Sequence, residues 1–371
     1  MDLLASKHYC LMTYGCQMNE SDSERYAGQL EELGYTPTED PELADVILMN
    51  TCCVRETAED KVLGKIGEFK HLKMRNKDLI LAVTGCMAQE WQDRLFKRAP
   101  HLDLVIGTHN IHKLIDLIKE KEGQKESHML ATEMEDNVFH AVPTKRFQKF
   151  FAWVPIMNGC NKFCTYCIVP YVRGREVSRS LEEIVEEIRN LAKEGYKEIT
   201  LLGQNVNSYG LDFKDGTDFS ALLYAIEDID GIERVRYMTS HPKDMTFTMI
   251  DAIAQCKKVV SHIHLPVQSG STELLKRMNR GYTTEHYEEL VSYIREKMPQ
   301  AVLTTDIIVG FPGETEADFE ETYRMCRELE FAGIHAFPFS ARPGTEAWKM
   351  QPKVPERIAG QRIKKLNELA E

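Results

Sequence analysis

A repeated strand–helix pattern in the first 120 residues constrains the fold of this chain more than any other feature. Four short apolar runs stand at Tyr9–Thr13, Val46–Met49, Leu79–Val83 and Leu104–Ile106. Helical patterns follow them at Glu20–Leu33, from Glu56 onward, at Gln89–Lys97 and at Ile111–Lys121. Strands that alternate with helices at this spacing predict a parallel, doubly wound α/β sheet. In such sheets ligands bind at the carboxyl ends of the strands.

Three cysteines, Cys16, Cys52 and Cys86, come directly after the first three of these runs, one strand–helix unit apart. Because neighbouring strands lie about 5 Å apart, three such ends can converge on one cubane [4Fe-4S] cluster. The alternative is three buried structural thiols, since free cysteine is among the most buried residue types. The repeated setting favours an auxiliary cluster. It leaves Cys53 open as an alternative ligand to Cys52.

A second group of cysteines, Cys160, Cys164 and Cys167, has the spacing C-x3-C-x2-C within one loop. A cubane cluster needs four ligands, so three local thiolates leave one iron open to a ligand that is not protein. Zinc sites usually combine two C-x2-C pairs or cysteine and histidine pairs, and the sequence offers no second pair of that kind. Ten cysteines without an export signal indicate a reducing, cytoplasmic location, which argues against disulfides.

The rest of the chain predicts a second α/β domain. We expect domains at 1–121 and 150–371, joined by a polar linker at 122–149. Strands are predicted at Ala152–Ile156, Glu198–Leu202, Arg234–Met238, His262–Leu265, Leu303–Val309 and Gly333–Phe337. Helices between them indicate a partial (β/α)6 barrel, with its site at the strand carboxyl ends. A capping box at Ser180–Glu183 begins one helix, and a charged helix at Val354–Glu371 ends the chain.

Charge and hydropathy exclude some functions. The net charge of −12 argues against a generally basic nucleic-acid-binding protein. The sequence contains no run of about 18 apolar residues, so we predict no membrane-spanning helix. Residues 143–179 are an exception, with seven basic residues against the single acid Glu176. This segment is a solvated basic loop, a set of arginines that orient a cofactor, or a rim that contacts phosphates.

The cysteine pattern resembles the methylthiotransferases of the radical S-adenosylmethionine (SAM) superfamily over essentially all 371 residues. The resemblance lies in four motifs: Thr13-Tyr14-Gly15-Cys16-Gln17-Met18-Asn19, Asn50-Thr51-Cys52-Cys53-Val54-Arg55-Glu56, Gly85-Cys86-Met87-Ala88-Gln89 and Cys164-Thr165-Tyr166-Cys167-Ile168-Val169-Pro170. The first motif and Arg173–Arg179 look like the branch that acts on N6-isopentenyladenosine beside the tRNA anticodon. Branches acting on a ribosomal protein or on threonylcarbamoyladenosine usually differ at Gln17 or Met18. The family pattern favours Cys52 over Cys53.

The resemblance implies two [4Fe-4S] clusters, held by Cys16, Cys52 and Cys86 and by Cys160, Cys164 and Cys167. One SAM would methylate a sulfur on the auxiliary cluster. A second would give the 5′-deoxyadenosyl radical that removes hydrogen from the substrate adenine. The implied partners are tRNA containing N6-isopentenyladenosine, a low-potential electron donor and a sulfur donor. We expect the protein to be a monomer that does not contact a membrane. Members of the family normally carry a small C-terminal β-barrel that binds RNA. No such segment is present, so we expect either a truncated chain or a chain that binds tRNA more weakly.

The resemblance also implies SAM contacts. Tyr166 would pack on the SAM adenine, and Gly203, Gln204 and Asn205 would form the turn that receives the amino group. Ser240, Gln268 and Arg175 would reach the ribose or the carboxylate. Loop packing for Tyr166 and ordinary turn chemistry for the others are the alternatives. His241, His262 and His264 are expected to be structural, and Cys10, Cys256 and Cys326 to be inert core thiols.

Two interpretations from other classes remain. The first is a non-catalytic iron–sulfur electron carrier or redox sensor that binds RNA. A carrier does not need the strand-end loops of a barrel after Cys167, which argues against it. The second is a zinc-stabilised structural protein, which a metal count would test.

Overall fold

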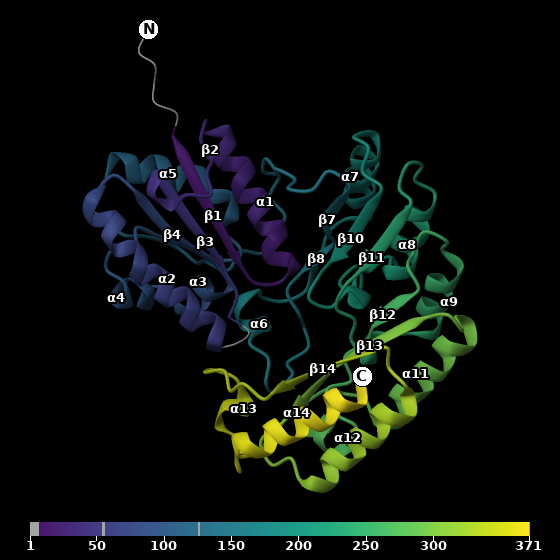
Figure 1. Ribbon diagram of the computed structural model, residues 1–371. Helices are drawn as coiled ribbons and strands as arrows, with labels where there is room; N and C mark the ends of the chain where they lie inside the picture. Colours follow the sequence, from purple (N-terminus) through teal and green to yellow (C-terminus); the bar gives the residue numbers. More distant parts are fainter. Residues whose placement is uncertain (1–6, 54–55, 125–126, 371) are drawn as a thin grey trace. The chain divides into compact units, whose positions relative to one another are not determined.

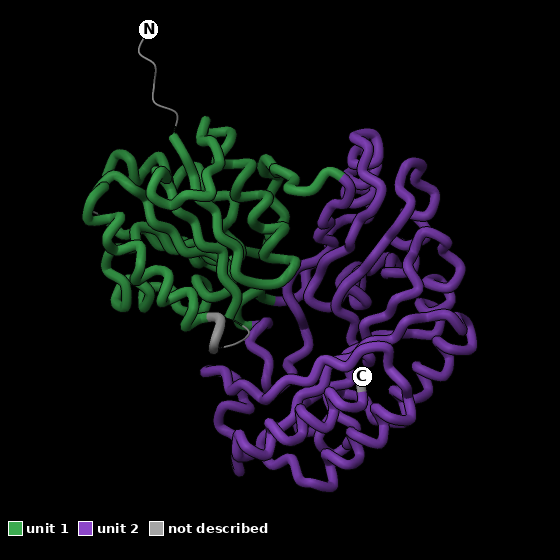
Figure 2. Tube along the Cα trace, viewed as in Figure 1, with its two compact units in different colours: residues 1–149, 171–174 green, residues 150–170, 175–371 purple. Residues whose placement is uncertain are grey.

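The structure is a computed structural model that describes residues 7–53, 56–124 and 127–370. The chain divides into two compact units, shown in different colours in Figure 2. The first unit is Met1–Lys149 with Tyr171–Gly174, and the second is Phe150–Pro170 with Arg175–Glu371. The four residues Tyr171–Gly174 therefore pack with the first unit although both of their flanking segments belong to the second.

The first unit contains a six-stranded, fully parallel sheet with the strand order β2-β1-β3-β4-β5-β6. Its strands are β1 (His8–Tyr14), β2 (Thr36–Pro37), β3 (Val46–Thr51), β4 (Ile80–Gly85), β5 (Leu104–Ile106) and β6 (Met129–Ala131). Its helices are α1 (Gln17–Glu32), η1 (Pro41–Leu43), α2 (Glu56–Arg75), α3 (Cys86–Trp91), α4 (Arg94–Arg98), η2 (Ile111–Lys113) and α5 (Leu114–Gly123). The strand order reverses at β1, which lies between β2 and β3. Doubly wound sheets bind ligands outside such a reversal.

Apolar side chains on both faces of this sheet explain why it is covered by helices. Every residue of β3 and β4 is buried, as expected for central parallel strands. On one face, Tyr26, Ala27 and Leu30 of α1 and Leu114 and Ile118 of α5 pack against alternate strand residues. The helices α2 and α3 contact β3 from the other face (Figure 1). The predicted doubly wound sheet is confirmed.

The second unit contains two three-stranded parallel sheets, ordered β11-β10-β7 and β12-β13-β14. Their strands are β7 (Phe151–Pro155), β10 (Glu198–Leu202), β11 (Arg234–Tyr237), β12 (His262–His264), β13 (Val302–Val309) and β14 (Gly333–Pro338). A short antiparallel pair joins β8 (Met157–Asn158) to β9 (Val177–Ser178). Between β11 and β12 the ladder is reduced to one bridge, Val235 with Val259. The six predicted strands all occur, and one continuous core supports the partial-barrel prediction.

The helices of the second unit alternate with these strands (Figure 1). They are α7 (Leu181–Lys193), η3 (Val206–Ser208), α8 (Phe219–Glu227), η4 (Pro242–Asp244), α9 (Phe247–Gln255), α10 (Thr272–Arg277), α11 (Thr284–Lys297), α12 (Glu316–Leu329), α13 (Glu346–Lys349) and α14 (Glu356–Ala370), while α6 (Val169–Val172) contains residues of both units. Ser180 caps α7, because its side chain accepts a hydrogen bond from the Glu183 N–H at 3.3 Å. This contact confirms the serine half of the predicted capping box.

Two local predictions were wrong. The helix predicted over Gln89–Lys97 is two helices, α3 and α4. The chain breaks at Gln92, whose φ of 49° lies outside the helical region. The stretch 122–149, for which the sequence gives no periodicity, contains β6, which pairs with β5 as an edge strand. A strand of three residues is too short to produce a periodic signal.

Candidate cluster and cofactor sites

The register of the first sheet brings three cysteine-bearing turns to one edge. Tyr14 pairs with Thr51, and Thr51 pairs with Gly85, across the neighbouring strands β1, β3 and β4. Cys16, Cys52 and Cys86 follow these residues by one or two positions. The predicted convergence of the three strand ends therefore holds in the backbone. The edge is also where the strand order reverses.

An amide pair holds two of these turns together. The Asn19 side chain donates to Asn50 Oδ1 at 3.0 Å, and Asn50 Nδ2 donates back to the Asn19 carbonyl at 2.8 Å. The same Asn19 side chain accepts a hydrogen bond from the backbone N–H of Cys16 at 3.2 Å. The motif asparagines thus fix the backbone from which the cysteines project. Val54 and Arg55 of the second motif lie outside the described residues.

The Cys53 thiol lies against Cys86. Cys53 is 1% exposed, and its hydrogen bond to Cys86 raises the pKa of Cys53 well above the usual value for a thiol. The same hydrogen bond is the largest cause that lowers the pKa of Cys86, to about 6, and the charge of Arg173 also lowers it. Cys86 is therefore the thiol of this group prepared to be a thiolate.

Arg173 is a buried cation at this edge, and the sequence did not single it out within the basic segment. The residue is 3% exposed, and its guanidinium donates to Asp22 at 2.9 Å and to the Cys86 sulfur at 3.4 Å. Two contacts fix its backbone: Thr108 donates to the Val172 carbonyl at 2.6 Å, and His109 Nε2 lies 3.0 Å from the Arg173 carbonyl. A buried cation beside thiolates can balance their negative charge.

In the second unit, the loop of Cys160, Cys164 and Cys167 is closed by its own turn and held by the segment after α10. The Cys167 N–H donates to the Cys164 carbonyl at 2.9 Å, and the Thr165 N–H donates to the Met278 carbonyl at 3.0 Å. Burial raises the pKa of Cys160 and of Cys167 to about 12. Thiols in this environment stay protonated in water at neutral pH and release their protons to solvent only when a metal binds the sulfur.

A second buried arginine, Arg280, contacts this loop and was also missed. It is 5% exposed and donates to the Cys164 sulfur at 3.4 Å, to Tyr166 Oη at 3.3 Å and to the Pro266 carbonyl at 2.9 Å. None of its hydrogen bonds among the described residues goes to a carboxylate. No sequence signal marks it, because Asn279-Arg280-Gly281 reads as an ordinary polar turn.

Two of the predicted SAM residues, Gln204 and Asn205, are connected to the cysteine loop by separate contacts. Gln204 Oε1 accepts from the Gly159 N–H at 2.5 Å, directly before Cys160. Asn205 donates to Asp244 at 2.7 Å, and Lys162 of the loop forms an ion pair with the same carboxylate at 2.7 Å. A Cβ on Gly203 would stand 2.5 Å from Met157 Cγ, so glycine allows the close approach.

Three buried polar atoms around these strand ends have no hydrogen-bond partner within the part of the chain that the structure describes. They are Asn205 Oδ1, Ser240 Oγ and His241 Nε2. Burying such atoms without a partner costs about 1–3 kcal/mol each. A ligand with an amino group, a carboxylate and a ribose would supply partners, so the residues fit SAM.

The other residues predicted to contact SAM are Tyr166, Gln268 and Arg175, and their contacts among the described residues are with other protein groups. Tyr166 packs against the small core of Leu274, Met278, Phe311 and Ala347, which is the loop-packing alternative. Gln268 has a φ of 73°, and its backbone joins β13. The Arg175 guanidinium lies 4.4 Å from the Phe163 ring centroid, within the cysteine loop. His262 and His264 each contact Thr304 Oγ1 at 3.0 Å, as expected for structural histidines.

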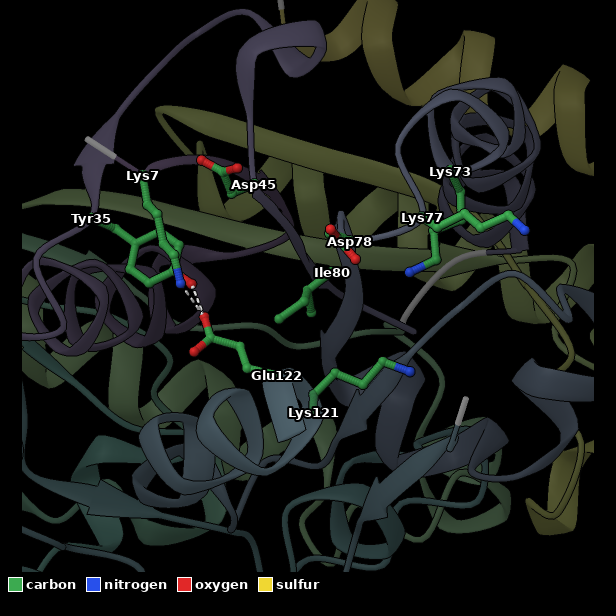
Figure 3. Close-up of a pocket in the computed structure, with 9 residues that line it drawn as sticks. All are labelled: Lys7, Tyr35, Asp45, Lys73, Lys77, Asp78, Ile80, Lys121 and Glu122. Atoms are coloured by element: carbon green, nitrogen blue, oxygen red, sulfur yellow. Dashed lines mark hydrogen bonds and ion pairs between the residues drawn. The ribbon is translucent and has the colours of Figure 1, made fainter. Parts of the chain in front are cut away.

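A cavity of the first unit lies away from the cysteines. It has a volume of about 340 Å³ and is lined by Lys7, Lys73, Lys77 and Lys121 together with Asp45, Asp78 and Glu122 (Figure 3). Lys7 forms an ion pair with Glu122 at 2.5 Å. His8, Val46 and Ile80 begin the strands at this edge, whereas the cysteines follow the strand ends. No described helix is long and apolar enough to cross a membrane.

Comparisons with known proteins agree with this geometry. Residues 154–326 match the radical SAM superfamily, and residues 8–107 match the uncharacterized protein family UPF0004. A tRNA-2-methylthio-N(6)-dimethylallyladenosine synthase of Desulforamulus reducens is 52% identical over 98% of this chain and 80% of its own length. One from Clostridium botulinum is 51% identical over 99% of this chain and 82% of its own length.

Solved structures support the fold. The structure of the radical S-adenosylmethionine methyltransferase TsrM from Kitasatospora setae superimposes with a TM-score of 0.64 at 14% sequence identity. The matched region covers 89% of this chain and 73% of the TsrM chain. The cobalamin-dependent radical enzyme OxsB covers 98% of this chain and 56% of its own, with a TM-score of 0.62. From its identity to the curated relatives over nearly its whole length, the chain belongs to the tRNA-2-methylthio-N(6)-dimethylallyladenosine synthase family of radical SAM enzymes.

Proposed function

We propose that this protein methylthiolates carbon 2 of N6-isopentenyladenosine, also called dimethylallyladenosine, next to the anticodon of tRNA. The observation that carries the proposal is the pair of cysteine sets, each beside a buried arginine that donates to one sulfur. Membership in the family favours this substrate over a ribosomal protein or threonylcarbamoyladenosine, and it favours an enzyme over an electron carrier.

The proposed ligands are the residues named from the sequence. Cys160, Cys164 and Cys167 would hold the cluster that binds SAM, and Cys16, Cys52 and Cys86 would hold the auxiliary cluster. When bound, the clusters and SAM supply the electron, the 5′-deoxyadenosyl radical and the sulfur.

The protein residues have separate roles in this proposal. Arg173 and Arg280 donate to cluster thiolates and keep the negative charge of each set in balance. Gln204 positions the loop through Gly159, while Asn205, Ser240, Gln268, Tyr166 and Arg175 would orient SAM. Burial of the loop excludes water from the reacting atoms.

The proposal includes partners and a location. An electron donor of low potential and a sulfur donor are needed, because the reaction consumes electrons and cluster sulfur. We further propose a monomer that works in the cytoplasm, where thiolate ligands stay reduced.

The test is mass spectrometry of nucleosides from isopentenylated tRNA after anaerobic incubation with the reconstituted protein, SAM, sulfide and reductant. We expect a methylthio mass gain on isopentenyladenosine. Cys164→Ala should abolish both this product and 5′-deoxyadenosine. Cys16→Ala should abolish the product while 5′-deoxyadenosine is still released, because the two sets have different tasks.

Matched controls are available on the same units. Cys10→Ala, in β1, and Cys256→Ala, after α9, remove thiols that are buried away from either set, and both should keep the activity. Abundant 5′-deoxyadenosine without a methylthio product in the unaltered protein would contradict the substrate. Absence of both products would contradict the enzyme.

A further inference from the structure

A second group of metal-ligand side chains lies in the first unit, apart from the cysteines. His112 of η2 and Glu135 and His140, which follow β6, each offer one ligand atom within 4.8 Å of the others. His140 Nε2 lies 3.2 Å from Glu135 Oε2, and His112 Nε2 lies 3.7 Å from the same oxygen. Zinc bonds of about 2.0–2.1 Å in a tetrahedron separate ligand atoms by about 3.3 Å. The three atoms therefore need only small movements to share one ion.

The carboxylate is oriented for this purpose. Its other oxygen, Glu135 Oε1, accepts from Asn110 Nδ2 at 3.0 Å and from Lys113 Nζ at 2.8 Å. These contacts leave Oε2 directed at the two imidazoles. Hydrogen bonds that hold a ligand from behind are typical of metal sites.

The backbone of the site is also anchored. The Glu135 N–H donates to His109 Nδ1 at 3.1 Å, and Arg25 donates to the His140 carbonyl at 3.1 Å. These bonds cross from a segment of irregular structure to α1 and to the loop before η2. The ligands are thus placed by contacts outside the group itself.

The histidines are suited to bind as neutral ligands. Their rings stack with centroids 3.7 Å apart, so two protonated rings would repel each other. His112 Nδ1 is buried and has no hydrogen-bond partner among the described residues, so the ring can turn without breaking a bond. The three side chains are 23–28% exposed, which leaves a path for an ion.

From these contacts we propose that His112, Glu135 and His140 bind one divalent cation of the zinc type. The ligand set of two imidazoles and one carboxylate suits zinc. The ion would join η2 to the chain after β6 and so hold residues 133–140 against the rest of the first unit. The fourth position would be taken by water.

The test uses the full chain with both clusters loaded, so that the cluster cysteines are occupied. The protein is dialysed anaerobically against buffered Zn²⁺, and zinc and iron per chain are measured by elemental analysis. We expect one zinc per chain, with unchanged iron. His112→Ala, His140→Ala and Glu135→Gln should each lose this zinc, whereas His128→Ala, at an exposed histidine of the same unit, should keep it.

Two further readouts distinguish zinc at these three residues from zinc bound by cysteine thiolates or at the protein surface. X-ray absorption at the zinc edge should show nitrogen and oxygen ligands at about 2.0–2.1 Å, not sulfur at about 2.3 Å. Zinc should raise the melting temperature of the unaltered protein and of His128→Ala, but not of Glu135→Gln, which keeps the shape of the site. Sulfur ligation, or a zinc content equal in all variants, would overturn the proposal.

Discussion

Two buried arginines distinguish the cysteine sites from ordinary core thiols. Arg173 balances Asp22 and Cys86 in the first unit, while Arg280 contacts Cys164, Tyr166 and backbone carbonyls in the second. A cation that donates to a cluster sulfur stabilises the reduced, more negative cluster. Arg280 has no carboxylate among its described hydrogen-bond partners, so the Cys164 sulfur is the group among these partners best able to carry a counter-charge.

The ion pair of Arg173 and Asp22 predicts a large stability effect from one residue. The two side chains are only 4% and 6% exposed, so removing the Arg173 guanidinium leaves the Asp22 carboxylate buried without its ion-pair partner. Arg173→Gln should destabilise the first unit by about 3–5 kcal/mol, and Arg173→Gln with Asp22→Asn should recover much of this. Urea unfolding of the cluster-free chain, followed by tryptophan fluorescence, measures the free energy of unfolding of each variant. In all of the compared proteins Trp153 and Trp348 are replaced by Phe, so that Trp91 alone reports on the first unit.

A double variant as unstable as Arg173→Gln alone would contradict this account. It would mean that lost packing, and not the unpaired Asp22 carboxylate, determines the cost.

His241 predicts a pH dependence. Burial, followed by the charge of Arg280, lowers its pKa to about 2. Between this value and about 6.5 the unfolded chain binds a proton that the folded chain does not. Stability from this residue is therefore complete above about pH 6.5 and falls by about 1.4 kcal/mol per pH unit below it.

His241→Asn should flatten this acid slope by close to one proton. Asparagine can still cap η4, because the His241 side chain accepts from the Lys243 N–H at 3.2 Å and an asparagine oxygen can do the same. Urea unfolding of the cluster-free chain from pH 7 to pH 5 measures the slope. An unchanged slope would show that His241 takes up its proton in the folded protein.

At the scale of elements, the junction of β4 and α3 determines where Cys86 lies. Gly85 has a φ of 88° and ψ of −157°, a region that only glycine adopts readily. A Cβ there would stand 2.5 Å from Asn50 Oδ1 and from the Thr51 carbonyl oxygen. The turn therefore depends on glycine in order to keep β4 against β3 up to its last residue.

Gly85→Ala should destabilise the first unit by at least about 1–3 kcal/mol and lower the iron bound at the auxiliary site. Gly64→Ala is the matched control. Gly64 lies in α2 with nothing within 4 Å of a new Cβ, so alanine should stabilise by about 0.5–1 kcal/mol. Iron analysis and urea unfolding measure both effects. Equal iron in the two variants would contradict a special role for this turn.

At the scale of the whole molecule, the structure changes the meaning of the basic segment 143–179. Five of its seven cations form ion pairs: Lys145 with Glu31, Arg146 with Glu24, Lys162 with Asp244, Arg173 with Asp22 and Arg179 with Glu187. Lys149 and Arg175 have no carboxylate partner among the described residues. The segment is therefore largely neutralised, which argues against the phosphate-contacting rim.

This predicts a weak salt dependence of tRNA binding. The logarithm of the association constant should fall with the logarithm of salt concentration with a slope of about −1 to −2, because few free cations contact phosphate. Fluorescence anisotropy with a labelled, isopentenylated anticodon stem–loop measures the slope. The double variant Lys149→Gln with Arg175→Gln should bring this slope closer to zero. A slope near about −6 would instead support the interpretation of residues 143–179 as a phosphate-contacting rim.

The sequence by itself determined the elements and the cysteine pattern. Hydrophobic periodicity marks strands and helices, and a motif directly after a strand must lie at the end of that strand, so β1, β3 and β4 and the cysteines after them followed from local spacing. Only the tertiary structure decided which charges are buried and paired. Arg173 and Asp22 are 151 residues apart, and a contact over such a distance exists only once the chain has folded. The break at Gln92 and the short strand β6 likewise depend on tertiary packing, because neither has a periodic signal of its own.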